Sequence, residues 1–107
     1  MLRVINAIEE KTGLTPVPIE TKNAEKCVVY RYHKTAKYSY RLELRVMAST
    51  FKECKEIADK IYELEDFGDE TYIDGVSISL NGGGTLKDYE NNMIQTLIYF
   101  DVITKGV

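Results

Sequence analysis

Few residues of this chain combine the type and the spacing that catalysis requires. His33 is the one histidine, and it lies between Arg31 and Lys34. A general base needs an orienting partner and a nucleophile or substrate within reach, and no nucleophile–base pair is evident here. We therefore interpret His33 as a surface-loop histidine and expect no enzymatic activity.

Metal and cofactor chemistry is also not indicated. The two cysteines, Cys27 and Cys54, match no ligand spacing, and each occurs in an apolar pattern. This pattern favours buried free thiols, with a disulfide as the alternative. The carboxylates between Glu63 and Asp74 lack the alternating spacing and terminal glutamate of a calcium loop, so we interpret them as solvated acidic surface. We expect neither a metal nor a cofactor.

The segment from Asn81 to Thr85, with Gly82, Gly83 and Gly84 between them, is the most unusual local sequence. Three glycines after a strand are found in phosphate cradles, but no Lys-Ser/Thr follows and no helix begins close behind. The sequence predicts instead a long mobile loop over residues 81–92, between the last two strands. Because long loops in small domains are often functional, we expect this loop to become ordered on contact with a partner.

Length and composition are typical of one globular domain spanning residues 1–107. The chain is 44% hydrophobic and 29% charged, which is ordinary globular composition. No apolar run approaches the roughly 20 residues that span a bilayer, and the N-terminus lacks a signal-peptide pattern. We therefore expect synthesis in a cytoplasm and no membrane partner. The net charge of −3 and the pI near 5.2 argue against sequence-specific binding of nucleic acid.

Apolar spacing predicts two helices. The first covers residues 2–12, with Leu2, Ile5 and Ile8 on its buried side and Gly13 at its end. The second covers residues 51–65 and begins at a capping box that Thr50 forms with Glu53. The buried stripe of this second helix should contain Phe51, Cys54, Ile57, Ala58, Ile61, Tyr62 and Leu64.

The remaining pattern predicts four strands. They cover residues 26–32, 38–47, 76–80 and 93–104, with an extended connector or edge segment at 15–19. The first two should pair as an antiparallel hairpin across a short loop at 33–37. The last strand is apolar on both faces, which predicts a helix on one side and another subunit on the other. This order predicts an α+β fold, with a single antiparallel or mixed four-stranded sheet and two helices packed on one face.

Charge is segregated along the chain. From Lys22 to Arg45 there are seven basic residues and two acidic ones, and from Glu53 to Asp74 there are nine acids and two lysines. One interpretation is a solvated hairpin and a solvated helix. The other is a polar subunit, in which the basic edge of one copy meets the acidic edge of the next and the contacts close into a ring. In that case, charge reversal at Arg41 and Arg45 should weaken self-association.

Tyrosine is enriched, with eight copies and no tryptophan. Tyr30, Tyr32, Tyr38 and Tyr40 should gather on one face of the predicted hairpin. They are interpreted either as the edge of the core or as anchors of a protein interface. A platform for single-stranded nucleic acid would need them inside a basic groove, which the overall acidity disfavours.

Three segments carry a resemblance to a known family: the opening helix at 2–8, the strand and helix at 40–64, and the closing pattern of a glycine-rich turn at 82–84 followed by residues 98–102. In these segments the chain resembles the tail-terminator, or tail-completion, proteins of long-tailed phages and prophages, often labelled minor capsid proteins. The resemblance implies a structural protein that forms a ring, usually a hexamer. Such a ring caps the finished tail tube and joins it to the head connector.

The resemblance also implies a place in the virion, at the head-proximal end of the tail, after synthesis in a bacterial host. The family has no catalytic signature, so the candidate contacts to other copies, the tail tube and the connector are inferred from pattern. They are Tyr38, Tyr40, Arg41, Arg45, Gly82, Gly83, Gly84, Lys87, Asp88, Tyr99 and Asp101. If the final strand has an exposed edge, it should pair with another subunit by strand addition. The alternative is a small ferredoxin-like binding or regulatory module with a protein or small-molecule partner.

Overall fold

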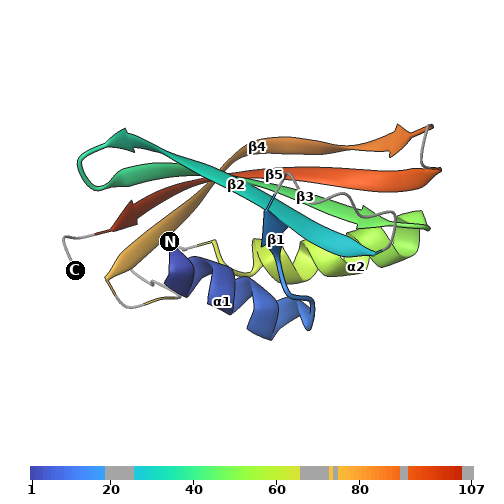
Figure 1. Ribbon diagram of the computed structural model, residues 1–107, viewed down its shortest axis with the longest axis horizontal. Helices are drawn as coiled ribbons and strands as arrows, with labels where there is room; N and C mark the ends of the chain where they lie inside the picture. The colour runs from blue at the N-terminus through green and yellow to red at the C-terminus, as the bar shows by residue number, and fades with distance from the viewer. Residues whose placement is uncertain (19–25, 66–72, 74, 90–91, 105–107) are drawn as a thin grey trace.

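The computed structural model, which describes residues 1–18, 26–65, 73, 75–89 and 92–104, has an α+β fold (Figure 1). Its sheet has five strands in the order β1-β2-β3-β5-β4. The elements are α1 (Leu2–Thr12), β1 (Val17–Pro18), β2 (Cys27–Ala36), β3 (Ser39–Ala48), α2 (Phe51–Tyr62), β4 (Val76–Asp88) and β5 (Met93–Thr104). The sheet is mixed because β1 pairs with β2 in parallel, whereas the other three pairs are antiparallel.

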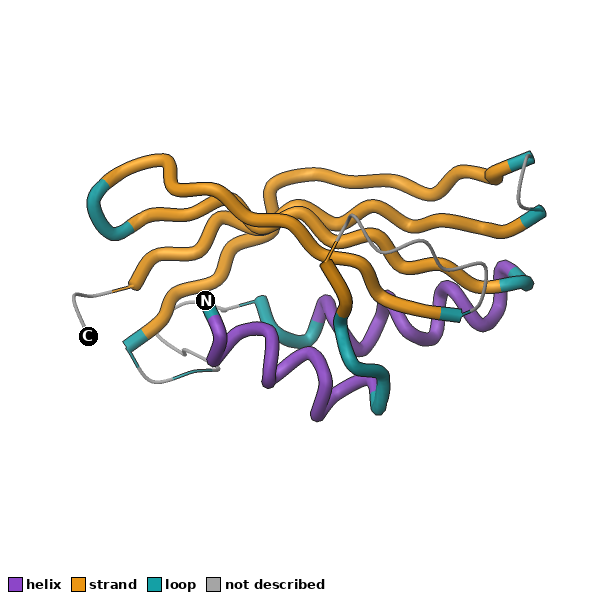
Figure 2. The backbone as a smooth tube through the Cα atoms, in the orientation of Figure 1, coloured by secondary structure: helices purple, strands orange, loops and turns teal. Residues whose placement is uncertain are grey.

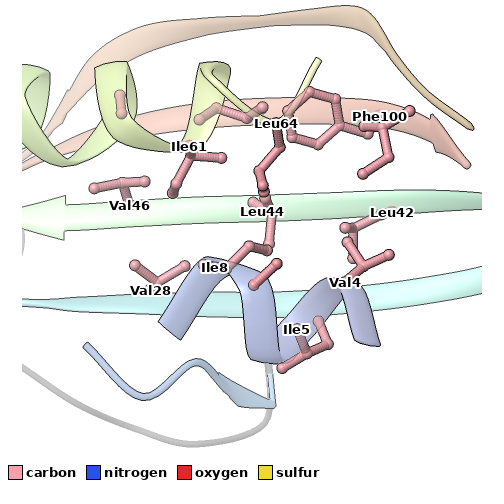
Figure 3. Close-up of a cluster of buried hydrophobic side chains, with 14 of the residues drawn as sticks. Val4, Ile5, Ile8, Val28, Leu42, Leu44, Val46, Ile61, Leu64 and Phe100 are labelled. Atoms are coloured by element: carbon pink, nitrogen blue, oxygen red, sulfur yellow. The ribbon is translucent and has the colours of Figure 1, made fainter. Parts of the chain in front are cut away.

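Both helices lie on the same face of the sheet, as Figures 1 and 2 show. The core fills the space between them and the strands, and its side chains come from alternate positions of β2, β3, β4 and β5. Figure 3 shows Ile8 of α1 beside Leu44 of β3, and Leu64, which follows α2, beside Phe100 of β5. All four side chains are at most 1% exposed. We call this side the helix face and the opposite side the open face, because neither helix covers it.

The predicted signals are confirmed at the start of α2 and at the end of α1, whereas α2 ends at Tyr62 and not at residue 65 as predicted. The Thr50 hydroxyl oxygen accepts a hydrogen bond from the backbone N–H of Glu53 at 3.2 Å, which is the N-cap expected for α2. Gly13 adopts the left-handed conformation at φ 73° and donates its N–H to the Glu9 carbonyl, which ends α1. Neither helix is long and apolar enough to cross a membrane, within the part of the chain described.

Two side chains predicted to be buried are exposed. Leu2 is 73% exposed and Phe51 is 60% exposed. Each is the first residue of its helix, and helical side chains point back towards the N-terminus. These two side chains therefore project beyond the end of the helix rather than onto the sheet, and the predicted stripes were wrong at these positions.

The hairpin and the edge segment differ from expectation in their bounds. β2 continues to Ala36, so the predicted loop at 33–37 shrinks to a turn at Lys37 and Tyr38. The edge segment predicted at 15–19 contains β1, which pairs with Val29 and Tyr30 of β2. This short pairing adds a fifth strand to the predicted four, and it makes the sheet mixed rather than wholly antiparallel.

The predicted loop over residues 81–92 was wrong. β4 runs through the glycines to Asp88, and only residues 89–92 separate it from β5. The pairing of β4 with β5 shifts between Leu80 and Gly83, where Gly82 and Gly83 have φ values of 102° and 142°. These conformations suit glycine, so the glycine run forms a bulge within a long strand instead of ending it.

Candidate interaction surfaces

The sheet has an open edge on each side. On one side β4 is the outermost strand, and residues 79–87 are all exposed. On the other side β1 covers only Val29 and Tyr30 of β2, so residues 31–36 pair with β3 but have no strand on their outer side in the described part of the chain. We call these stretches the β4 edge (Val76–Asp88) and the β2 edge (residues 31–36). Unpaired strand edges are sites for the addition of another strand.

The sequence analysis expected the last strand to pair with another subunit, but the strand with an open edge is β4. β5 has the predicted bounds, but it lies between β3 and β4 and so has no open edge. Ile98, Phe100 and Val102 on its helix face are fully buried, whereas Tyr99 and Asp101 on the open face are half-buried and Ile103 is exposed. Burial on both faces of β5 is therefore not complete within one copy.

The β4 edge is protected near its bulge. The N–H of Leu80 points away from β5 and donates a hydrogen bond to Glu65 Oε1 at 3.3 Å. A bulge also twists an edge away from regular pairing. Another strand could therefore pair most simply on either side of Leu80–Gly83, or by displacing the Glu65 carboxylate.

Charged side chains form cross-strand pairs on the open face. Arg31 of β2 pairs with Glu43 of β3, and Arg41 of β3 lies 3.6 Å from Asp101 of β5. Asn81 also donates a hydrogen bond to Asp101, at 2.8 Å. Since Arg41 has a partner within its own copy, charge reversal there would also disturb the pair with Asp101. Its role as a contact between subunits remains a prediction.

The predicted contact residues do not form one surface, because they lie in several parts of the structure. Arg41, Arg45, Tyr99 and Asp101 lie together on the open face of β3 and β5. The three glycines lie within the β4 edge, and Lys87 and Asp88 lie at the far end of that strand. Lys87 Nζ is 5.3 Å from the centre of the Tyr89 ring, and Asp88 accepts a hydrogen bond from Gln95 at 2.9 Å.

The four tyrosines of the hairpin divide between the helix face and the turn. Tyr30, Tyr32 and Tyr40 form a row, with ring centres 6.4 Å and 6.2 Å apart. Tyr30 and Tyr40 pack against the core, whereas Tyr32 is 45% exposed. Tyr38 lies in the turn, with Lys37 Nζ 5.2 Å from its ring centre. Figures 1 and 2 show that this hairpin tip extends beyond the helices.

Some relevant residues were missed by the sequence prediction. Arg31 and Glu43 belong to the open-face pairs, and His33 and Ser79 lie at the two ends of one row that crosses the sheet through Arg41 and Asp101. Alternation along the strands could have placed Arg31 and Glu43 on the face of Arg41. The row itself needed the strand order and register.

The two cysteines are buried inside the protein and form no disulfide. Cys27 and Cys54 are both free and buried, as predicted. Burial raises the pKa of the Cys27 thiol, so it is protonated at neutral pH. Cys54 Sγ lies 3.1 Å from the hydroxyl of Thr96. Among the described residues, no three His, Cys, Asp or Glu side chains gather as metal ligands.

The acidic segment is described only in part. Of its nine acids, Asp66, Asp69, Glu70 and Asp74 lie outside the described residues. On α2, Asp59 pairs with Lys55, and beyond the helix Glu63 pairs with Lys11. The described part of this surface is thus mixed in sign, and the predicted acidic edge stays a prediction.

Comparison of the chain with protein-family models and with curated proteins gives no match. The two sheet edges and the open face are therefore the features of this chain that bear on its function.

Proposed function

We propose that this chain is a structural protein of a phage or prophage tail, which caps the tail tube as a hexameric ring and joins it to the head connector. The observation that carries the proposal is the pair of open edges on opposite sides of one sheet. A subunit with two different edges can bind a neighbour at each, and such head-to-tail contacts form a ring when the rotation closes.

The strand directions are compatible with this contact. β2, β3, β5 and β4 are antiparallel in succession, so β2 and β4 run in opposite directions. A second copy in the same orientation would therefore place its β2 edge antiparallel to the β4 edge of the first. The sheet would continue from copy to copy, with every pair of helices on one side of the ring.

Other features support the same proposal. The resemblance of residues 2–8, 40–64 and 98–102 to tail-terminator proteins implies a ring of this kind. The open face and the turn at Lys37 and Tyr38 remain available in such a ring for the tail tube and the connector. In this function the protein works in the virion, at the head-proximal end of the tail, and needs no catalytic group.

Light scattering across a concentration series, with negative-stain imaging of the heaviest species, tests the proposal. We expect the mass to rise with concentration and to stop at a closed ring. Two-fold dimers as the final species would contradict a head-to-tail contact. A protein that stays monomeric and does not bind the ends of purified tail tubes would contradict tail capping.

A small ferredoxin-like binding or regulatory module is the second candidate. The observation that favours it is the open face, which neither α1 nor α2 covers and which contains a small pocket lined by residues that include Val29, Arg45, Leu97 and Tyr99. This alternative predicts a stable monomer that uses the face for one ligand or partner. A monomer at every concentration, together with tail tubes that it leaves uncapped, would favour this function.

A further inference from the structure

Arg45 is the arginine of the open face that the sheet register leaves without an acid opposite. Arg31 is aligned with Glu43, and Arg41 is aligned with Asp101. Arg45 is instead aligned with Val29 of β2 and Leu97 of β5. No ion pair joins Arg45 to another of the residues that the structure describes.

The guanidinium of Arg45 is partly withdrawn from water. Its Nε is buried and has no hydrogen-bond partner in the described part of the chain. A buried donor without a partner is costly, and most buried polar atoms in folded proteins are paired. The Nε of Arg41 is unpaired as well, but that side chain lies 3.6 Å from Asp101. Arg45 has no such acid among the residues that the structure describes.

A pocket of about 40 Å³ lies at this point of the sheet. Its lining includes Arg45, the apolar side chains of Val29 and Leu97, and the Tyr99 ring, with the Arg31–Glu43 pair at its border. A water molecule needs roughly 10–15 Å³ of such space, so the pocket has room for a few waters or for one small planar group. Apolar walls around a cation strengthen its bond to an incoming anion.

The charge of the surrounding face also favours an anion. Among the residues that the structure describes, Arg31, Arg41 and Arg45 lie with two carboxylates, Glu43 and Asp101, in the central part of the open face, so the cations there outnumber the acids by one. The whole chain carries a net charge of −3. The local excess is therefore opposite in sign to the protein as a whole, and Arg45 is its unpaired member.

We propose that Arg45 and its pocket bind a carboxylate, supplied by a glutamate or aspartate side chain of a second protein that lies on the open face. A guanidinium suits this role because its planar N–H donors match the two oxygens of a carboxylate. The assignment to a different protein rests on the proposed function, in which copies of this chain meet through their sheet edges and leave the open face free.

Nuclear magnetic resonance of the arginine Nε–Hε groups tests this site. The probe is the tripeptide acetyl-glycyl-glutamyl-glycine amide, and the control is the same peptide with glutamine. We expect a saturable shift of the Arg45 Nε–Hε signal with the glutamate peptide, and binding roughly tenfold weaker with glutamine, because charge-assisted hydrogen bonds are the stronger class. The Arg31 signal should remain in place, since Glu43 already occupies its guanidinium. Arg45→Lys identifies the signal and should bind the peptide more weakly.

Three results would overturn the proposal: an equal response to both peptides, the same shift with sodium chloride at equal ionic strength, or no saturable shift of Arg45. If adding unlabelled copies of this chain shifted the Arg45 Nε–Hε signal of the labelled protein, the carboxylate would come from another copy. That result would overturn the proposal of a different protein as partner. The titration is performed at concentrations where light scattering shows single copies. A negative titration would therefore contradict the Arg45 site without contradicting ring assembly. Conversely, a protein that forms no ring could still bind the peptide at Arg45.

Discussion

Replacing Gly83 by alanine is expected to destabilise the protein by about 2–4 kcal/mol, because a side chain there meets backbone that cannot move cheaply. Gly83 has a φ of 142°, and a Cβ built at this position lies 2.1 Å from the Leu97 carbonyl oxygen. Leu97 belongs to β5, which is held between β3 and β4. Relief of the clash requires β4 to separate from β5 or to change register.

Gly84→Ala is the matched control. A Cβ at Gly84 meets nothing within 4 Å, so this variant should stay within about 0.5 kcal/mol of the parent. Unfolding of both variants by urea measures the difference directly. Equal stability of the two variants would contradict the pairing of β4 through its glycines, and would restore the mobile loop that the sequence suggests for residues 81–92.

Replacing Phe100 by alanine is expected to destabilise the protein by about 3–5 kcal/mol. Phe100 is fully buried, and it is the largest of the side chains that are completely enclosed. It lies on the helix face of β5, beside Leu64, which follows α2 (Figure 3). Its removal would leave a cavity where the sheet meets the second helix, and the rigid strands on either side of β5 limit how far the site can collapse.

Tyr89→Ala provides the comparison for Phe100→Ala. Tyr89 is also aromatic but is 83% exposed, and its ring contacts Lys87. Loss of an exposed ring of this kind should change the free energy of unfolding by less than about 1 kcal/mol. If the two variants lost similar stability in urea, Phe100 would not lie in the core that joins the sheet to the helices.

The parts of the fold that follow from local spacing were predicted well. The alternation of Leu42, Leu44 and Val46 with charged residues fixed the two faces of β3, and all three side chains are buried on the helix face. The cap of Thr50 and the left-handed Gly13 marked helix ends from single residues. Period and capping are properties of a few neighbouring residues, so they are visible in a sequence.

The errors arose where distant parts of the chain decide the structure. Glycines commonly mark turns, but Gly83 is held in β4 by its pairing with Ile98 on β5. The two residues of β1 become a strand only because β2 lies beside them. In both cases the deciding partner is far along the sequence, and no local pattern identifies it.

The candidate site was predicted in pieces for the same reason. Sequence reasoning selected Arg41, Arg45, Tyr99 and Asp101, and register places all four on one face of β3 and β5. It did not show that Arg41 faces Asp101 or that Arg45 faces Leu97, because those relations depend on how the strands align. The part of the β4 edge beyond Leu80 was missed, since residues 81–88 lie in the segment predicted as a loop.

Cysteine crosslinking between the two edges tests most directly whether copies join head to tail. His33 and Ser79 lie at opposite ends of one row on the open face. Three strand spacings separate them, about 14 Å, which is too far for a disulfide within one copy. His33→Cys is combined in turn with Ser79→Cys and with Ser77→Cys, to allow for the stagger that closing a sheet introduces. The native cysteines are buried and remain in place.

Oxidation of a double variant should produce a ladder of covalent species on a non-reducing gel that ends at the closed ring. Each single variant carries one exposed thiol and should stop at a dimer. Head-to-tail contact between the β4 edge and the β2 edge predicts a ladder in at least one double variant. It predicts nothing larger than a dimer in the single variants. Monomers and dimers alone in both double variants would contradict it.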